Sequence, residues 1–261
     1  MNAILETRGL NRNFGAVTAA RDINVRIAPG EVVGVIGSNG AGKTTFINMV
    51  TGYLPPSSGE ILFEGRSILG KKPRQIIRSG MTRSFQVAQL FPELTVLDNL
   101  LIALVAAESP RPSFLGGLRT RERIARADEI LVEFAVQRYR DAIVRTVPQG
   151  ARKLVDIAMA LIGRPRMLLL DEPTSGVSVE EKLPLMDTVM HAVRRHGVTV
   201  LFVEHDMEVV ERYVSRVLAF YSGEIISDGT PAEVFADARV QELVIGHGHG
   251  RPAAAKERSA A

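Results

Sequence analysis

Hydrophobic and polar positions alternate along residues 3–30, and the alternation is interrupted at FG and at APG. A period of two favours short antiparallel strands. Residues 31–37 (EVVGVIG) form a nearly continuous apolar run, as expected of a strand that is buried on both faces. The segment TTFINMVTG then predicts a helix that ends at Gly52, and residues 53–68 predict a turn followed by another strand.

The pattern changes to helical spacing between about residues 74 and 163. The segments LTVLDNLLIALVAA and RERIARADEILVEFAV place apolar residues three and four positions apart, which predicts two helices. Residues 109–117 predict a loop between these helices, and residues 151–162 predict a further helix. Apolar strands return in RMLLLDEP, VTVLFVEHD and RVLAFYSGEIISDG, with helices between them. This order predicts an α/β core with an inserted helical subdomain.

Two changes of pattern divide the chain. We expect the core to comprise about residues 1–85 and 164–246, and the helical subdomain to comprise about residues 86–163. Residues 247–261 contain mostly small and charged residues, so we predict a disordered C-terminal tail.

Composition narrows the class of protein. With 261 residues and 46% hydrophobic content, the chain can bury a sizeable core, which excludes extensive disorder. The absence of cysteine excludes disulfides and cysteine-ligated metal sites. The net charge of +3 comes without the long basic run of a nucleic-acid-binding arm, so we predict no nucleic acid partner.

The hydropathy pattern predicts neither a signal peptide nor a membrane-spanning helix. The N-terminus MNAILETRGLNRNF lacks the apolar centre of a signal peptide, so we predict no export. The longest apolar run, residues 100–107, is much shorter than the roughly 20 residues that cross a bilayer. We therefore expect any link to a membrane to go through a partner.

Residues 37–45 (GSNGAGKTT) match the phosphate-binding pattern G-x-x-x-x-G-K-[ST]. Glycines allow backbone N–H groups to surround a phosphate chain, and the helix that follows presents its positive end to it. Lys43 would reach the β- and γ-phosphates, and the Thr44 hydroxyl would ligate Mg²⁺. The alternative is a Gly-rich turn without a ligand. The predicted phosphate-binding residues are Gly37, Ser38, Asn39, Gly40, Ala41, Gly42, Lys43, Thr44 and Thr45.

Residues 168–173 (LLLDEP) supply acidic groups at the end of an apolar strand. Asp171 stands where its carboxylate can hold Mg²⁺ through water. Glu172 follows directly, and a carboxylate that faces the γ-phosphate is suited to act as a general base toward water. The alternative is that Glu172 only stabilises a turn before Pro173.

Residues 201–206 (LFVEHD) end another apolar strand with polar residues. Open α/β sheets bind ligands at this edge, so His205 is a candidate to hydrogen-bond a phosphate oxygen, and a structural role is equally open. Phe14 is an aromatic residue in a polar turn that either stacks on a base or belongs to the core. No physical pattern singles out Gln86.

In this order, Phe14, the loop at 37–45, Gln86, a helical block, LLLDEP and His205 resemble the ATP-binding subunits of ABC transporters over about residues 3–245. The resemblance implies an α/β fold: a P-loop NTPase (RecA-like) core with an N-terminal antiparallel β-subdomain and an inserted α-helical subdomain. It also implies that two such subunits enclose two ATP molecules. Each ATP then lies between the P-loop of one subunit and the signature motif of the other.

The resemblance also implies roles for single residues. Phe14 would stack on adenine, and Gln86 would sense Mg²⁺ and the γ-phosphate while linking to the membrane subunit. Glu172 would be the catalytic base, and His205 would contact the γ-phosphate. The implied cofactors are ATP and Mg²⁺, and the implied metal-binding residues are Thr44, Gln86 and Asp171.

Within the family, MTRSFQVAQLFPELTVLDNLLIAL and the long linker at 106–120 resemble importers of branched-chain (hydrophobic) amino acids. This implies a second ABC ATPase subunit, two transmembrane permeases and, indirectly, a soluble substrate-binding protein. We expect a heterodimer, with a homodimer as the alternative, at the cytoplasmic face of the bacterial inner membrane. An importer for another small solute of the urea or amide type, and a weakly hydrolysing regulatory subunit, are the alternative functions.

The chain departs from the family at the signature motif L-S-G-G-Q. By its position before Asp171, this motif falls on residues 147–151 (VPQGA), where only Gly150 matches. The serine hydroxyl that would reach the partner's γ-phosphate is absent. Gln149, Gly150 and the free N–H groups of the helix that follows remain as donors.

A second departure lies in the family's interface loop, where Ser178 stands in place of an aspartate. Both changes would act on the partner's ATP rather than on the ATP bound by this chain. Two hypotheses follow. Either the partner's ATP turns over more slowly in an asymmetric heterodimer, or backbone groups replace the missing side chains without loss.

Overall fold

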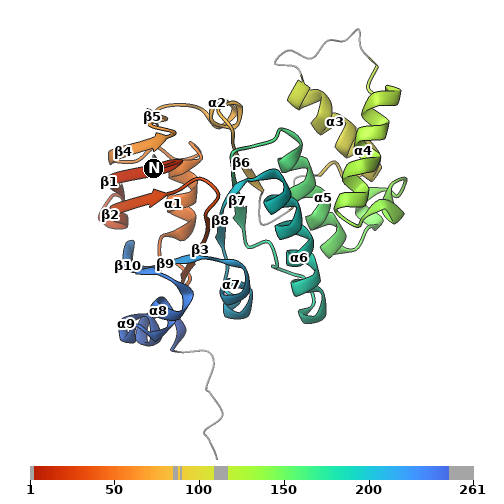
Figure 1. Cartoon of the computed structure of the whole chain (residues 1–261). Coiled ribbons are helices and arrows are strands. Elements are labelled where there is room, and N and C mark those ends of the chain that lie inside the picture. The colour runs from red at the N-terminus through yellow and green to blue at the C-terminus, as the bar shows by residue number, and fades with distance from the viewer. Residues whose placement is uncertain (1–2, 85–87, 89, 109–116, 247–261) are drawn as a thin grey trace, which may run out of the picture.

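The computed structural model describes residues 3–84, 88, 90–108 and 117–246, which form two sheets and a set of helices (Figure 1). The strands are β1 (Leu5–Phe14), β2 (Val17–Ile27), β3 (Val32–Gly37), β4 (Ser58–Phe63), β5 (Arg66–Ser67), β6 (Met81–Ser84), β7 (Met167–Asp171), β8 (Thr199–Val203), β9 (Arg216–Tyr221) and β10 (Glu224–Gly229). The helices are α1 (Lys43–Val50), α2 (Pro73–Arg78), α3 (Val96–Glu108), α4 (Arg121–Glu133), α5 (Gln149–Ile162), α6 (Val179–His196), α7 (Met207–Tyr213), α8 (Pro231–Ala236) and α9 (Ala238–Val240). Short helical turns are η1 (Gln137–Tyr139), η2 (Val144–Thr146) and η3 (Gln241–Ile245).

The N-terminal sheet is antiparallel, with the strand order β2-β1-β4-β5. Leu5 of β1 pairs with Ile27 of β2 on one side and with Phe63 of β4 on the other, and all three side chains are buried. They pack in one hydrophobic cluster with Phe46 of α1. The alternation of apolar and polar residues therefore gives this sheet one buried face, and the predicted antiparallel strands are confirmed.

The six-stranded sheet has the order β10-β9-β3-β8-β7-β6. All its neighbours are parallel except β10, which is antiparallel to β9. Strands β3, β8 and β7 lie side by side near its centre, so their last residues, Gly37, Val203 and Asp171, meet at one edge. The loops that follow these three strands contain most of the predicted site.

Side chains of each central strand alternate between two hydrophobic clusters. In β7, Leu168 and Leu170 pack in the cluster formed with α3, α5 and α6, and Leu169 packs in the cluster formed with α1 and the N-terminal sheet. Both faces of the strand are therefore covered. This explains why its sequence is an unbroken apolar run rather than an alternating one.

The helical subdomain consists of α3, α4 and α5, which lie on the side of the six-stranded sheet away from β1–β5 (Figure 1). Leu100 of α3, Leu131 of α4 and Ile157 of α5 are buried in one cluster. The C-terminal end of α5 reaches the sheet, where the Thr82 hydroxyl of β6 donates to the Ala160 carbonyl over 3.3 Å. The predicted α/β fold with an inserted helical subdomain is confirmed, and its residue boundaries stay a prediction.

The structure differs from the sequence-based prediction in three places. Residues 81–84 form the edge strand β6, so the expectation of helical structure from about residue 74 is wrong there. Helix α4 ends at Glu133, three residues early, and Ala135 then adopts a left-handed conformation with φ 55°. Helix α5 begins at Gln149, two residues before the predicted start. Most of the predicted loop at 109–117 and the whole tail at 247–261 lie outside the described residues.

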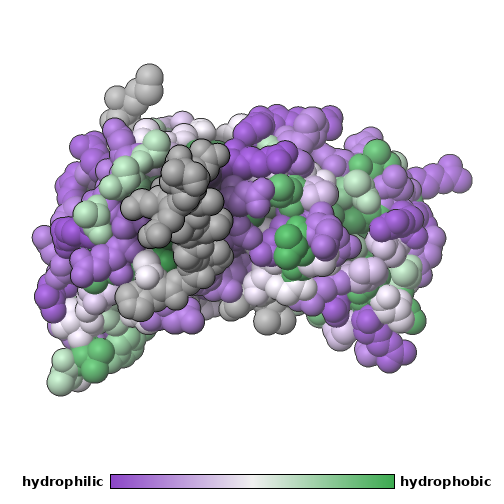
Figure 2. All heavy atoms as spheres, turned by 90° about the horizontal axis from the view of Figure 1, so that it is seen from below, coloured by the Kyte–Doolittle hydropathy of each residue, from purple (hydrophilic) through white to green (hydrophobic). Residues whose placement is uncertain are grey.

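The surface in Figure 2 is mostly hydrophilic, and apolar side chains appear on this face as separate small patches. No helix in the part of the chain that the structure describes has the length and apolar character needed to span a membrane.

Candidate nucleotide-binding and hydrolysis site

The loop between β3 and α1 closes around a lysine. Gly42 has φ 103°, and a Cβ there would lie 2.6 Å from the Ala19 carbonyl oxygen, so the loop requires glycine at this position. Lys43 is only 6% exposed, and its Nζ donates to the carbonyl oxygens of Gly37 (2.7 Å) and Ser38 (2.9 Å). Burial lowers the pKa of Lys43, and the charges of Glu172 and Asp171 oppose this shift. The amine therefore lies inside the loop, opposite two carboxylates.

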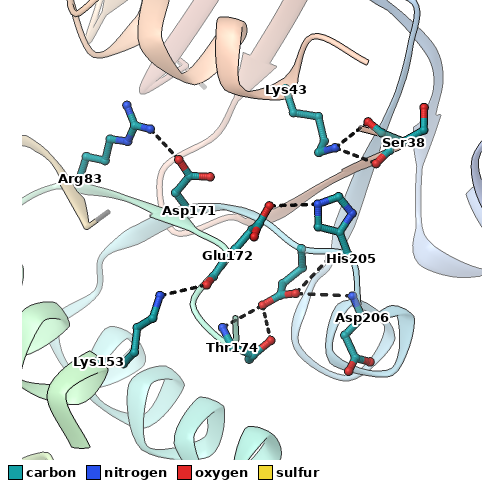
Figure 3. Close-up of polar contacts among 11 residues, drawn as sticks. Ser38, Lys43, Arg83, Lys153, Asp171, Glu172, Thr174, His205 and Asp206 are labelled. Atoms are coloured by element: carbon teal, nitrogen blue, oxygen red, sulfur yellow. Dashed lines mark hydrogen bonds and ion pairs between the residues drawn. The ribbon is translucent and has the colours of Figure 1, made fainter. Parts of the chain in front are cut away.

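Asp171, the last residue of β7, is held by an arginine that the sequence analysis did not single out. Arg83 Nη2 donates to Asp171 Oδ2 over 2.6 Å, and Arg83 Nη1 donates to Asn48 Oδ1 over 2.6 Å. The Arg83 and Asp171 side chains are 8% and 12% exposed, so this ion pair is buried. Figure 3 shows the second carboxylate oxygen of Asp171 pointing away from Arg83. One oxygen is thus fixed, and the other faces the space below Lys43.

Glu172 and His205 form a pair across the ends of β7 and β8. Glu172 Oε1 lies 3.0 Å from His205 Nε2, and their side chains are 23% and 41% exposed (Figure 3). Glu172 adopts φ 48°, a left-handed conformation that costs a non-glycine residue about 1–3 kcal/mol. Its N–H donates to the Val203 carbonyl over 3.0 Å, which helps to hold this conformation.

Lys153 connects the helical subdomain to the same loop. It is on α5, only 2% exposed, and its Nζ donates to the Glu172 carbonyl oxygen over 3.2 Å. Burial lowers the pKa of Lys153, and nearby acidic groups, Asp156 and Glu204 first, oppose the shift. The segment at residues 147–153 (VPQGARK), which includes the altered signature, therefore contacts the loop that carries Glu172.

Residues 20–175 match the model of the family described as ABC transporter. The chain belongs to this family. Its members bind ATP and hydrolyse it to power transport. They work as dimers of ATP-binding subunits, with membrane permeases in the importers.

Curated relatives in the ABC family cover nearly the whole chain. The high-affinity branched-chain amino acid transport ATP-binding protein BraF of Pseudomonas aeruginosa is 33% identical over 93% of this chain and 98% of its own length. The probable branched-chain amino acid transport ATP-binding protein LivG of Methanocaldococcus jannaschii is 32% identical over 93% of this chain and 97% of its own length.

Solved ABC structures agree with the fold. The crystal structure of the ADP conformation of MJ1267, an ATP-binding cassette of an ABC transporter, has a TM-score of 0.81 and 29% identity, over 94% of this chain and 100% of that chain. A nucleotide-free ATP-binding cassette from an ABC transporter has a TM-score of 0.80 and 30% identity, over 92% and 98% of the two chains.

The other predicted residues that the structure describes lie on β1, α1 and α5. Thr44 is exposed in the first turn of α1, and Phe14 is 47% exposed at the end of β1, with the Arg12 guanidinium 4.5 Å from its ring centroid. Gln149 and Gly150 begin α5, and Gln149 Nε2 lies 3.5 Å from the Ser175 carbonyl oxygen. The predicted residue Gln86 lies outside the described residues.

The buried Arg83–Asp171 ion pair leads to a prediction about stability. Removing one partner of a buried pair leaves an uncompensated charge, so we expect Arg83→Met to lower the free energy of unfolding by about 3–5 kcal/mol. Urea unfolding followed by circular dichroism measures this change. Arg212→Met is the matched control, because Arg212 and Asp187 form a pair with both side chains about half exposed, which contributes about 1 kcal/mol at most. Equal losses in the two variants would contradict the prediction.

Proposed function

We propose that this chain is the ATP-binding and ATP-hydrolysing subunit of an importer for branched-chain or other hydrophobic amino acids. The observation that carries hydrolysis is the Glu172–His205 pair, 3.0 Å apart beside the loop that contains Lys43. The substrate class rests on the curated relatives, which are branched-chain amino acid transport proteins over almost their full length.

Residues 37–45 fit the phosphates of a nucleoside triphosphate. The loop has glycine at position 42, where a side chain would collide with the Ala19 carbonyl, and Lys43 has its amine inside the loop. A phosphate oxygen would be a better partner for this ammonium than two neutral carbonyls, because hydrogen bonds between charged groups are the stronger ones. The free N–H groups at the start of α1 add donors for the phosphates. Phe14, half exposed at the end of β1, is proposed to stack on the adenine.

Thr44 and Asp171 fit a magnesium ion that is bound together with the nucleotide. Magnesium in such sites is typically held by one or two side chains, waters and phosphate oxygens. We propose that Thr44, Asp171 and Gln86 hold it, where it would neutralise charge on the phosphates. Arg83 already donates to one carboxylate oxygen of Asp171, so we expect Asp171 to offer its other oxygen to the magnesium ion.

Glu172 and His205 are proposed to perform the hydrolytic step. The Glu172 carboxylate accepts a proton from water while the water oxygen bonds to the γ-phosphorus. The bond from the γ-phosphorus to the oxygen that bridges it to the β-phosphate breaks, which releases ADP and phosphate. His205 contacts the γ-phosphate and, through its ring nitrogen, holds the carboxylate of Glu172 in position. Lys153 holds the Glu172 backbone from the opposite side, because its Nζ donates a hydrogen bond to the Glu172 carbonyl oxygen.

Gln149 and Gly150 are proposed to contact the ATP bound by a second ABC ATPase subunit. The complete assembly would contain this second subunit, two transmembrane permeases and a soluble substrate-binding protein, with our chain peripheral on the cytoplasmic face of the membrane. Pro148 precedes α5 and has no N–H, so the donors available there are the first N–H groups of the helix.

Purification of the tagged chain from mild-detergent extracts of its native membranes tests this proposal. We expect two permeases and a second ABC ATPase to co-purify, and the complex in proteoliposomes to take up radiolabelled leucine with ATP and the substrate-binding protein. Uptake of urea or a short amide in place of leucine would support the alternative substrate class. Failure of any permease to co-purify would contradict the transporter assignment.

The reduced signature at residues 147–151 leads to a second prediction, in the complete heterodimer. We expect Glu172→Gln in this chain to remove most ATP turnover, because it inactivates the site completed by the partner's signature motif. The equivalent change in the partner should remove the smaller part. Steady-state phosphate release from the two singly substituted complexes measures the difference, and equal residual rates would contradict the asymmetry.

A further inference from the structure

Glu204 is a buried carboxylate to which the proposed mechanism gives no role. It lies between β8 and His205, and it is only 3% exposed. Its Oε1 accepts from the Thr174 N–H (3.1 Å) and the Thr174 hydroxyl (2.6 Å). Its Oε2 accepts from the N–H groups of His205 (3.0 Å) and Asp206 (3.5 Å). One oxygen therefore binds the loop after β7, and the other binds the loop after β8.

These contacts join the two loops that hold the hydrolytic pair. Thr174 is two residues after Glu172, and His205 is directly after Glu204, so the carboxylate bridges both flanks of the pair (Figure 3). An ionised buried carboxylate is costly unless donors surround it. Four donors surround Glu204, and hydrogen bonds to a charged acceptor are among the strongest in proteins. Both oxygens of Glu204 therefore have hydrogen-bond donors, and the carboxylate holds the two loops together; we refer to these contacts as the Glu204 bridge.

We propose that Glu204 is a positioning residue that couples the loop at 172–178 to the loop of His205, and so sets the Glu172–His205 geometry. This inference deepens the proposed function and rests on it. The loop at 172–178 includes Ser178, at the position where the family resemblance implies contact with the second subunit. Through Glu204, a displacement of this loop reaches His205 without passing through the nucleotide.

Glu172 has a particular need for such support. Its left-handed backbone conformation is not the intrinsically favoured one, so it persists only where neighbouring contacts fix it. The Glu172 N–H donates to Val203, and its carbonyl accepts from Lys153 and from the Ser175 N–H. The Thr174 contacts tie the same turn to the His205 loop. Loss of the Glu204 bridge would remove that connection, and displacement of a catalytic group by about 1 Å can reduce rate about 100-fold.

Glu204→Gln is the first test, because glutamine keeps the size but presents an amide NH₂ in place of one carboxylate oxygen. That group cannot accept from the N–H groups of His205 and Asp206. In the complex with the second ABC ATPase subunit, with the base of the partner's own site replaced in both samples, we expect kcat for Mg-ATP hydrolysis to fall about 10–100-fold and KM to stay within about twofold of the parent. In the isolated full chain, we expect the affinity for the fluorescent analogue TNP-ATP to stay within about twofold of the parent. A parallel loss of TNP-ATP affinity would indicate a general structural role and overturn the proposal. An unchanged kcat would overturn it equally.

Thr174 provides the reciprocal test from the other loop. Thr174→Val removes the hydroxyl donor with little change of shape, and we expect it to lower kcat. In the double variant with Glu204→Gln, we expect kcat to be no lower than in the more affected single variant. Thr174→Ser retains the hydroxyl and is expected to restore kcat. Asp206→Asn is the matched control: this carboxylate is in the same loop but pairs with Lys182, away from Thr174. Full additivity of the two changes would exclude coupling through this bridge.

Hydrogen–deuterium exchange separates failure of the bridge from failure of the proposed function. Glu204→Gln should accelerate amide exchange in peptides covering 172–178, and Thr174→Val should accelerate it in peptides covering 204–206. Neither measurement requires ATP. A parent chain that does not bind TNP-ATP would contradict the proposed function, whereas unchanged exchange in both variants would contradict the bridge whatever the ATPase result.

Discussion

Replacing Glu172 with glutamine is expected to lower kcat for ATP hydrolysis by about 10²–10⁴-fold, the range that a general base contributes. Glutamine has the same shape and can retain a contact with His205 Nε2, which lies 3.0 Å from the carboxylate. It cannot accept a proton from water at neutral pH. Because Lys43 and the loop around it are unchanged, we expect ATP affinity to stay close to that of the parent chain.

Phosphate release by the complex with the second ABC ATPase subunit, with the base of the partner's own site replaced in both samples, measures kcat. TNP-ATP binding by the purified chain measures affinity separately. Glu208→Gln is the matched control, because this glutamate is exposed on α7 near the same loop and forms none of the contacts of the hydrolytic pair described above. It is expected to leave kcat within about twofold of the parent. A Glu172→Gln chain that still hydrolyses ATP at a comparable rate would show that another group acts as the base.

Sequence reasoning succeeded where a single strand or motif determines position. The loop at 37–45, Asp171, Glu172 and His205 each follow a buried apolar strand, and parallel strands place their ends at the same edge of the sheet. The structure brings Lys43, Asp171, Glu172 and His205 together for that reason. Their chemical roles remain predictions, because geometry alone does not measure them.

Strand β6 was missed because its sequence, MTRS, has neither an apolar run nor clear alternation. Among the described strands it pairs only with β7, at the edge of the sheet, so tertiary pairing rather than local pattern defines it. Arg83 was missed with it. A lone arginine gives no signal in the sequence, and its function depends on Asp171 and Asn48, which are distant in the chain.

Lys153 and Glu204 were missed for a different reason. Both are buried charged residues, and a buried charge usually has a partner. Glu204 is the first residue after β8, the strand that also indicated His205, so the argument used for His205 applies equally to Glu204. Lys153 is less accessible to such reasoning, since the helix that carries it begins two residues before the predicted start and its acceptor is a backbone oxygen.

Lys43→Met is expected to weaken ATP binding about 10²-fold or more while leaving the fold intact. An ammonium that reaches two phosphate groups contributes charge-assisted hydrogen bonds of about 1.5–3 kcal/mol each, and every 1.4 kcal/mol corresponds to about tenfold in affinity. Methionine fills a similar volume but donates nothing. Competition with TNP-ATP measures the affinity, and Lys71→Met, which lies just before α2 outside the loop at 37–45, is the control.

Stability should respond to Lys43→Met in the opposite direction from affinity. Burial lowers the pKa of Lys43, which means that the folded chain disfavours the charged form, despite the opposing charges of Glu172 and Asp171. Removing this amine should therefore leave the free energy of unfolding in urea unchanged or raise it, as is common where a residue serves ligand binding rather than folding. A loss of ATP affinity together with a large loss of stability would instead mean that the contacts of Lys43 with Gly37 and Ser38 hold the loop together.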